Sequence, residues 1–123
     1  MFEVTLRSQF SAAHRLENYH GKCENFHGHN WKVAVVVQRQ DLDSSEMVID
    51  FKILQDILER FLTQLDHTFL NELPFFANTN TTSERVAYVV YKHIAPDIEL
   101  SGTKLTRVEV WEDEYCSAAY IPE

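Results

Sequence analysis

Alternation of apolar and polar residues marks both ends of the chain. Residues 2–10 (FEVTLRSQF) place apolar side chains on one face and polar ones on the other, which predicts a half-buried strand. Residues 31–38 (WKVAVVVQ) are aromatic and β-branched, as is typical of a second strand. Strand character returns at 105–112 (LTRVEVWE) and 116–121 (CSAAYI), joined by the tight sequence DEY. We therefore expect two pairs of strands, one pair at each end of the chain.

The apolar period lengthens to three and four residues in the middle of the chain. A helix is predicted to follow the N-cap residue Asp50. Its apolar stripe comprises Leu54, Ile57, Leu58, Phe61, Leu62 and Leu65. NELP at 71–74 is expected to stop any helix, and residues 81–84 (TTSE) have the pattern of a capping box. The second helix is predicted to carry Val86, Val90 and Ile94 and to end at Pro96.

The order ββααββ predicts an α+β fold. Paired strands favour an antiparallel four-stranded sheet with two helices packed on one of its faces. A chain of 123 residues is most simply a single domain, residues 1–123. Such a sheet has two exposed edges, which proteins normally cover or pair, so we expect the chain to oligomerise through them.

Composition excludes several functional classes. The formal net charge of −8, without clustered Lys and Arg, argues against nucleic-acid binding. No segment is apolar for long enough to span a membrane, and the first residues lack the apolar run of a signal peptide. Two cysteines are too few for a disulfide scaffold, so a reducing, cytoplasmic setting is expected.

Three histidines form a candidate metal site. His27 and His29 are separated only by Gly28, and on an extended segment both would project to the same side. His14, just past the first predicted strand, lies where a neighbouring antiparallel segment would bring it to them. Three imidazoles plus an open position suit catalytic zinc, and no carboxylate has the spacing of an iron facial triad. Two histidines lack this geometry and are expected to be structural or solvated, His20 and His93.

Three further residues, a cysteine and an adjacent Asp–His pair, are candidates for proton transfer or metal binding. Cys23 is either a fourth metal ligand, which would close the site, or a reactive thiol beside the metal; spacing leaves both open. The other cysteine, Cys116, is expected to be buried and structural. Asp66 and His67 are either a helix C-terminus, where a cationic imidazole complements the dipole, or a carboxylate orienting a proton-transfer group.

Glu112 continues a mostly apolar stripe of the strand at 105–112. A carboxylate in such a partly buried slot suits a ligand with adjacent N–H donors, such as a 2-amino-4-oxo pyrimidine ring. The alternative is an ordinary glutamate at a surface strand end.

Taken together, several segments resemble the 6-pyruvoyl-tetrahydropterin synthase family, and most closely its bacterial 6-carboxytetrahydropterin synthase branch. They are FSAAHRL, CENFHGHN, VIDF, LDHTFLNEL, TSERVA and VWE, and they cover nearly the whole chain. The resemblance implies the tunnelling fold, in which ββααββ subunits form trimers that close a barrel. Two trimers then stack as a homohexamer.

The resemblance also implies residue roles. The implied Zn²⁺ ligands are His14, His27 and His29. The implied proton-transfer residues are Cys23, Asp66 and His67, with Cys23 facing the Asp–His pair of a neighbouring subunit. Glu112 would anchor the pterin ring, and Thr82 and Ser83 match the family's Thr-Ser ahead of the second helix. Thr81 stands where relatives often have proline, which leaves the shape of that loop open.

The implied reaction converts 7,8-dihydroneopterin triphosphate to 6-carboxy-5,6,7,8-tetrahydropterin, releasing acetaldehyde and triphosphate, on the route to queuosine. Glu24 directly follows Cys23, and family members with a CExxHGH pattern resemble enzymes that yield 6-hydroxymethyl-dihydropterin for folate. Formation of 6-pyruvoyl-tetrahydropterin is a third alternative. Outside the family, the alternatives are a non-catalytic module around a closed Cys-His₃ zinc and a zinc hydrolase that uses metal-bound hydroxide.

Overall fold

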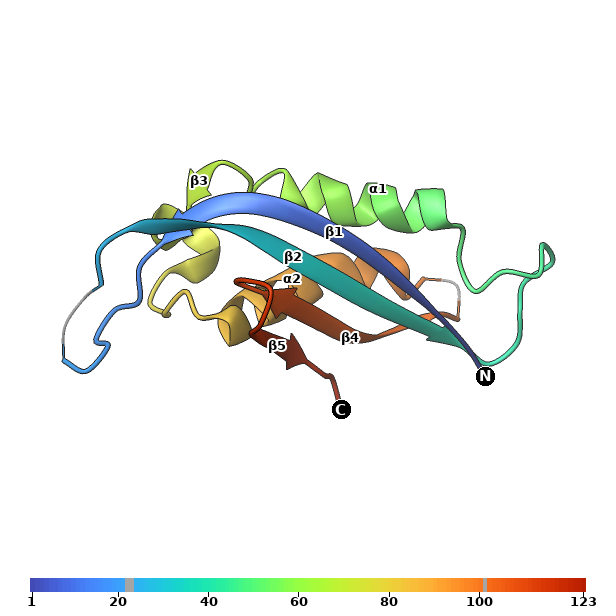
Figure 1. The fold of residues 1–123 in the computed structure, drawn as a ribbon. Helices are drawn as coiled ribbons and strands as arrows, with labels where there is room; N and C mark the ends of the chain where they lie inside the picture. The colour runs from blue at the N-terminus through green and yellow to red at the C-terminus, as the bar shows by residue number, and fades with distance from the viewer. Residues whose placement is uncertain (22–23, 101) are drawn as a thin grey trace.

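The computed structural model describes residues 1–21, 24–100 and 102–123 and confirms the α+β fold. One sheet has two helices packed against one of its faces (Figure 1). Two long strands, β1 (Phe2–His14) and β2 (His27–Arg39), form an antiparallel pair along the length of the molecule. On the other side of β2 come β4 (Lys104–Trp111) and β5 (Ser117–Tyr120), also antiparallel.

The sheet has five strands, one more than the sequence pattern predicts. The additional strand is β3 (Thr68–Phe69), which pairs parallel to β1 at Ala12 and Ala13, so the spatial order is β3-β1-β2-β4-β5. A strand of two residues leaves no alternation to recognise in a sequence. Because β3 reaches only this end of β1, the edge of the N-terminal part of β1 stays open within the described chain, as does the edge of β5.

Both helices begin where an N-cap side chain satisfies a free amide. Asp50 accepts from the Lys52 N–H at 2.8 Å and starts α1 (Phe51–Leu62), as predicted. The helix α2 (Ser83–Ile98) starts at Thr82, which accepts from Arg85 N–H at 3.1 Å. The N-cap is therefore Thr82, and the predicted capping box, which would need Thr81 in that position, does not form.

Two predicted helix ends are wrong. The helix α2 continues past Pro96, which lies on the exposed face, to Ile98, which extends the buried stripe. The helix α1 ends at Leu62, and buried Leu65 belongs to the following turn. The segment NELP (71–74) lies beyond it and overlaps two single-turn 3₁₀ helices, η1 (Leu70–Glu72) and η2 (Pro74–Phe76), with only Leu73 between them.

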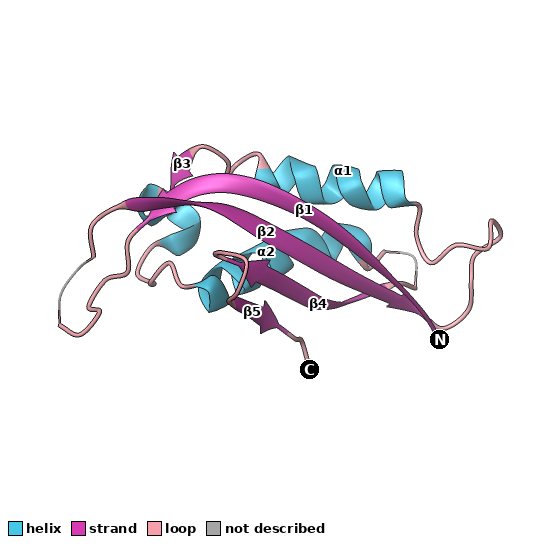
Figure 2. Cartoon of the chain, viewed as in Figure 1, coloured by secondary structure: helices cyan, strands magenta, loops and turns pink. Residues whose placement is uncertain are grey.

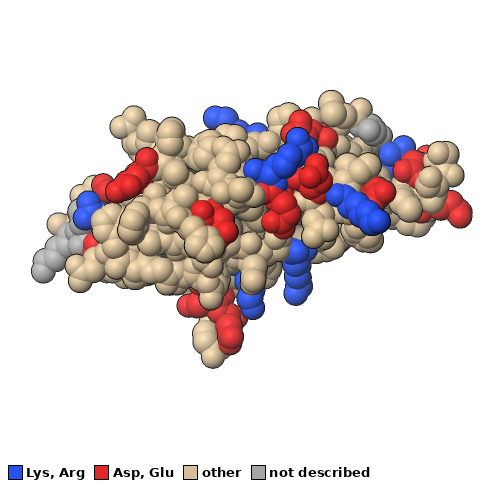
Figure 3. Space-filling model, turned by 90° about the horizontal axis from the view of Figure 1, so that it is seen from above, with Lys and Arg blue, Asp and Glu red and all other residues tan. Residues whose placement is uncertain are grey.

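The core lies between the sheet and the helices (Figure 2). Alternate residues of β2 provide its floor, and the helices cover it with their apolar stripes. The fully buried residues include Trp31, Val33, Val35, Val37, Leu54, Leu58, Val86, Val90, Val108 and Val110. Acidic and basic side chains are interspersed on the face that Figure 3 draws. Among the described residues, no helix has the length and apolar character needed to cross a membrane.

Candidate active site

The three candidate metal ligands lie at the end of the β1–β2 pair where β1 finishes and β2 begins. Both strands are longer than predicted and include the histidines: His14 is the last residue of β1, and its register partner is His27, the first residue of β2. His29 lies two residues further along β2, on the same face as His27. One ring nitrogen from each histidine lies within 4.8 Å of the others. The backbone ladder therefore brings together residues that are far apart in sequence.

The outer hydrogen bonds of two rings direct a lone pair toward the centre of the cluster. His14 Nδ1 lies 2.8 Å from the Thr81 carbonyl oxygen, and His27 Nδ1 lies 3.0 Å from the Asn25 carbonyl oxygen. A ring nitrogen that donates to a carbonyl carries the proton, so Nε2 of each neutral ring is left as an acceptor. This is the usual arrangement of a metal-ligating histidine.

The inner nitrogens have no protein partner that would explain their burial. The Nε2 atoms of His14 and His29 are buried and make no hydrogen bond within the described part of the chain. A buried unsatisfied nitrogen costs free energy, and a metal ion would remove that cost. Burial lowers the pKa of His14, which keeps the ring in the neutral form that binds metal. The three residues therefore fit a metal ion.

Trp31 supports the cluster from below. Its ring is fully buried, and its Nε1–H donates to the Ala12 carbonyl oxygen at 3.2 Å. It meets the rings of His14 and His29 edge-on, with centroids 4.9 and 5.4 Å away. This packing fixes two of the three imidazoles before any metal binds.

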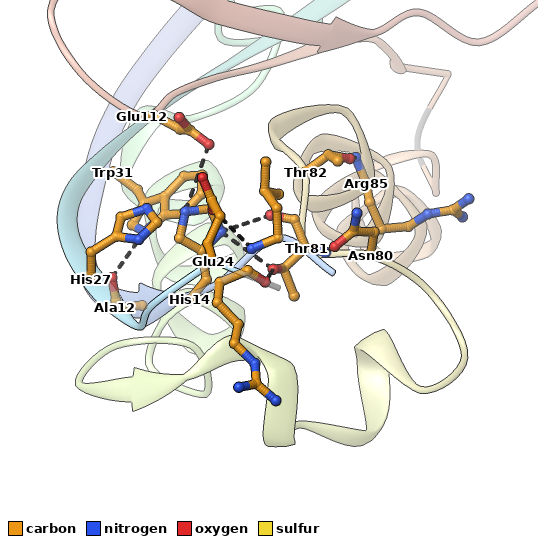
Figure 4. Close-up of polar contacts among 12 residues, drawn as sticks. Ala12, His14, Glu24, His27, Trp31, Asn80, Thr81, Thr82, Arg85 and Glu112 are labelled. Atoms are coloured by element: carbon orange, nitrogen blue, oxygen red, sulfur yellow. Dashed lines mark hydrogen bonds and ion pairs between the residues drawn. The ribbon is translucent and has the colours of Figure 1, made fainter. Parts of the chain in front are cut away.

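Glu112 joins the histidines to an adjoining hollow. It follows directly after β4, and its Oε1 lies 3.7 Å from His14 Nε2 (Figure 4). With Thr82 and Ser83 it lines a hollow of about 480 Å³. The structure thus brings together the three residues that the sequence suggests for substrate binding, next to the histidine cluster.

Asp66 and His67 form a pair, and its histidine lines a different hollow. Asp66 accepts from the Ser11 N–H and contacts His67 Nδ1, both at 2.8 Å. The Ser11 N–H, followed by His67, lowers the pKa of Asp66. His67 has a left-handed backbone (φ 58°) and an 82% exposed side chain, and it lies beyond the end of α1. It lines a hollow of about 450 Å³ that includes His29 but not Glu112.

Comparison with known proteins identifies the family. The family model described as 6-pyruvoyl tetrahydropterin synthase matches residues 3–123, nearly the entire chain. The chain belongs to the 6-pyruvoyl tetrahydropterin synthase family. Its fold agrees: the structure of 6-pyruvoyl tetrahydropterin synthase from Caenorhabditis elegans superimposes with a TM-score of 0.84 at 29% identity, covering 100% of this chain and 98% of that one.

Relatives within the family carry two different names. A 6-carboxy-5,6,7,8-tetrahydropterin synthase from Haemophilus influenzae is 29% identical, over 91% of this chain and 93% of its own. The human 6-pyruvoyl tetrahydrobiopterin synthase is 33% identical, over 98% of this chain and 92% of its own. The chain is therefore a member of a family of pterin synthases, and identity does not choose between these two reactions.

The structure describes only one of the two cysteines. Cys23, predicted as a ligand or a reactive thiol, lies outside the described residues. Cys116, predicted to be buried, is an exposed free thiol. It lies in the turn between β4 and β5, where its N–H is held by Asp113 at 2.9 Å. The short strand β5 begins only after this turn, so Cys116 has no core to enter.

Two residues at the site have roles that sequence patterns did not suggest. Thr81 is fully buried and provides the carbonyl that holds His14, a contact between residues 67 positions apart. Glu24, which the sequence links only to the choice of product, accepts a hydrogen bond from the Leu16 N–H at 2.9 Å. The capping-box pattern assigned Thr81 to the start of a helix and not to His14. No local pattern signals either contact.

Proposed function

We propose that this family member is a zinc-dependent lyase. Its substrate would be 7,8-dihydroneopterin triphosphate, and its products 6-carboxy-5,6,7,8-tetrahydropterin, acetaldehyde and triphosphate. The proposal rests on one observation: three converging imidazoles lie next to the hollow that contains Glu112. The name of the Haemophilus relative supports the choice of product, which would serve queuosine biosynthesis.

The zinc would be held by Nε2 of His14, His27 and His29. One ring nitrogen of each imidazole already lies within 4.8 Å of the others, so the three rings would need to move only a little closer to share one ion. When bound, zinc would supply Lewis-acid stabilisation for negative charge on the side-chain oxygens of the substrate. The lowered pKa of His14 favours the neutral imidazole that this binding requires.

Glu112 would orient the pterin ring. An ionised carboxylate accepts two adjacent N–H donors of a 2-amino-4-oxo pyrimidine in a bidentate hydrogen bond. Because Glu112 is 30% exposed and lies 3.7 Å from His14, a ring bound to it would lie in the hollow beside the metal ligands. Thr82 and Ser83 line the same hollow and would contact the ring.

Proton transfer would need residues of two subunits. Asp66 orients His67 through the 2.8 Å contact at Nδ1, which leaves Nε2 of His67 to exchange a proton. Cys23 would act as the other acid–base group. Since His67 lines a different hollow from Glu112, we propose that a neighbouring subunit brings its own Asp66–His67 pair to each site. The open edges of β1 and β5 would pair around a threefold axis, and two trimers would form a homohexamer.

Subunit complementation tests the shared site. Cys23→Ala and His67→Ala proteins would each be inactive, but co-assembled chains would form some sites in which both residues are intact. Random mixing of equal amounts would restore about one quarter of the wild-type activity. No recovery in co-assembled oligomers would show that both residues serve the same site within one chain.

The product assay decides among the family's reactions. Zinc-loaded protein would be incubated with 7,8-dihydroneopterin triphosphate, and the pterin and aldehyde products identified by mass spectrometry. The 6-carboxy product with acetaldehyde supports the proposal. The second candidate is 6-pyruvoyl-tetrahydropterin, favoured by the human relative's name and 33% identity. Detection of that product, or of 6-hydroxymethyl-dihydropterin, would replace the first choice.

The role of Cys23 separates an enzyme from a non-catalytic zinc module. In the proposed lyase, Cys23→Ala retains zinc and loses turnover. In a closed Cys-His₃ site, the same change would release the metal and lower stability. A zinc measurement on the purified variant, together with its turnover, distinguishes the two.

A further inference from the structure

Side-chain amides take over the role of strand partners where β1 ends. Beyond His14, β1 loses its pairing with β2, yet the next residues stay hydrogen-bonded. Asn71 Oδ1 accepts from Arg15 N–H at 2.9 Å, and Asn71 Nδ2 donates to the Arg15 carbonyl oxygen at 2.8 Å. Asn80 holds Glu17 in the same two-way manner, at 2.9 and 3.0 Å. Each amide thus copies the donor and acceptor of a peptide group.

Leu16, between Arg15 and Glu17, is held by a different residue, Glu24. Leu16 N–H donates to Glu24 Oε1 at 2.9 Å, and Glu24 N–H donates to the Leu16 carbonyl oxygen at 3.0 Å. Every backbone N–H and C=O of residues 15–17 therefore has a protein partner, although none lies in a described strand. Satisfying all six groups fixes the path of the segment.

This segment connects the two halves of the site. At one end is His14, held through the Thr81 carbonyl, and the Thr81 hydroxyl donates to the Arg15 carbonyl oxygen at 3.1 Å. At the other end, Leu16 and Glu17 line the hollow that contains Glu112. Displacing the segment would therefore move a metal ligand, the hollow, or both.

We infer that Asn71 and Asn80 are positioning residues, Asn71 for the metal ligand His14 and Asn80 for the wall of the pterin hollow. The inference rests on the proposed function, which assigns metal and pterin to these places. The division follows from the contacts with residues 15–17: Asn71 binds the residue adjacent to His14, whereas Asn80 binds Glu17 and itself lines the hollow. Asn80 Oδ1 also accepts from the Thr81 N–H, at 3.1 Å. Leucine matches the size of asparagine but neither donates nor accepts, so it tests the amide alone.

Amide hydrogen exchange in the metal-free protein tests the contacts directly. Asn71→Leu is expected to speed exchange at Arg15 by at least about tenfold, and Asn80→Leu that at Glu17. Asn71→Asp keeps the acceptor for Arg15 N–H and should keep its exchange slow. The matched control is Asn78→Ala: Asn78 has a left-handed backbone (φ 60°), so alanine lowers stability in the same loop without touching either amide. Unchanged exchange in both leucine variants would overturn the inference.

Zinc affinity and steady-state kinetics test the positioning. Asn71→Leu is expected to weaken zinc binding about tenfold, as loss of a metal site's outer support typically does, and zinc should restore its turnover at higher concentration. Asn80→Leu is expected to raise KM for the pterin while zinc affinity stays within about twofold of wild type. The control Asn78→Ala should change neither quantity.

The outcomes separate this inference from the proposed function. Faster exchange with wild-type zinc affinity and KM would show that the two amides only stabilise a loop, which overturns the positioning role. A wild-type protein that binds zinc and turns over the pterin while both leucine variants match it leads to the same conclusion. A wild-type protein that does neither overturns the proposed function, and the exchange measurement then still tests the two amide contacts.

Discussion

The unpaired histidine nitrogens allow a quantitative prediction about zinc and stability. A metal that binds only the folded chain stabilises it by about 2.7 kcal/mol when free zinc is 100 times its dissociation constant. Unfolding entropy near 2.1 cal/mol/K per residue gives about 0.26 kcal/mol/K for 123 residues. We therefore expect zinc at that concentration to raise the melting temperature by about 10 °C, measured by scanning calorimetry at fixed protein concentration.

The variant His29→Leu tests whether the rise in melting temperature comes from zinc bound to the histidines. In the metal-free protein His29 Nε2 is buried and has no hydrogen-bond partner among the described residues, a defect worth about 1–3 kcal/mol. Leucine removes the defect and loses edge contacts between rings worth about 1 kcal/mol. The metal-free variant should melt at or above the wild-type temperature, whereas the zinc-dependent rise should disappear.

A histidine outside the cluster provides the control. His93 stacks on Phe61 with ring centroids 4.5 Å apart and contacts the Val89 carbonyl oxygen. It does not belong to the cluster of three histidines. His93→Leu should lower the metal-free melting temperature and leave the zinc-dependent rise intact. A full rise in His29→Leu, or no rise in the wild type, would refute the assignment of the three histidines to a metal.

Three further predictions concern neighbouring residues. Glu112→Gln should weaken pterin binding by about 10–100-fold, measured by fluorescence titration, because a neutral amide cannot accept two N–H bonds with full charge; zinc binding should persist. Asp66 has a folded-state pKa below its ordinary value, so its contribution to stability is present at neutral pH and lost as pH falls through that lowered pKa. The melting-temperature deficit of Asp66→Asn should therefore vanish in acid, and a constant deficit would contradict the Ser11 contact. Trp31→Phe should cost about 2 kcal/mol in urea unfolding, because it loses a buried hydrogen bond and ring volume, whereas the half-buried Trp111→Phe should cost less.

Periodicity predicted the fold well because burial of one face gives each long strand or helix a regular repeat of apolar residues. The alternation in β1 and β2 and the apolar stripe of α1 correctly assigned strands and helices. The pattern failed where an element is short or where exposure decides its limits. The strand β3 has two residues, and α2 passes the exposed Pro96 to reach the buried Ile98. Neither fact has a local signature.

The sequence by itself determined which residues can carry chemistry. The spacing of His27 and His29 on an extended segment already implied a shared face, and alternation placed Glu112 after a buried stripe. Only the tertiary structure decided which of them meet. The register of β1 against β2 sets His14 opposite His27, and the loop before α2 brings Thr81 to the same ring.

The remaining decisions depend on contacts across long stretches of chain. Asn71 and Asn80 are unremarkable in the sequence, and their role appears only when their amides meet the backbone after His14. Likewise, only the structure shows that His67, which Asp66 holds, lines a different hollow from Glu112. Hydrogen bonding and burial act between neighbours in space, so local sequence fixes the elements, and the packed chain fixes which side chains share a site.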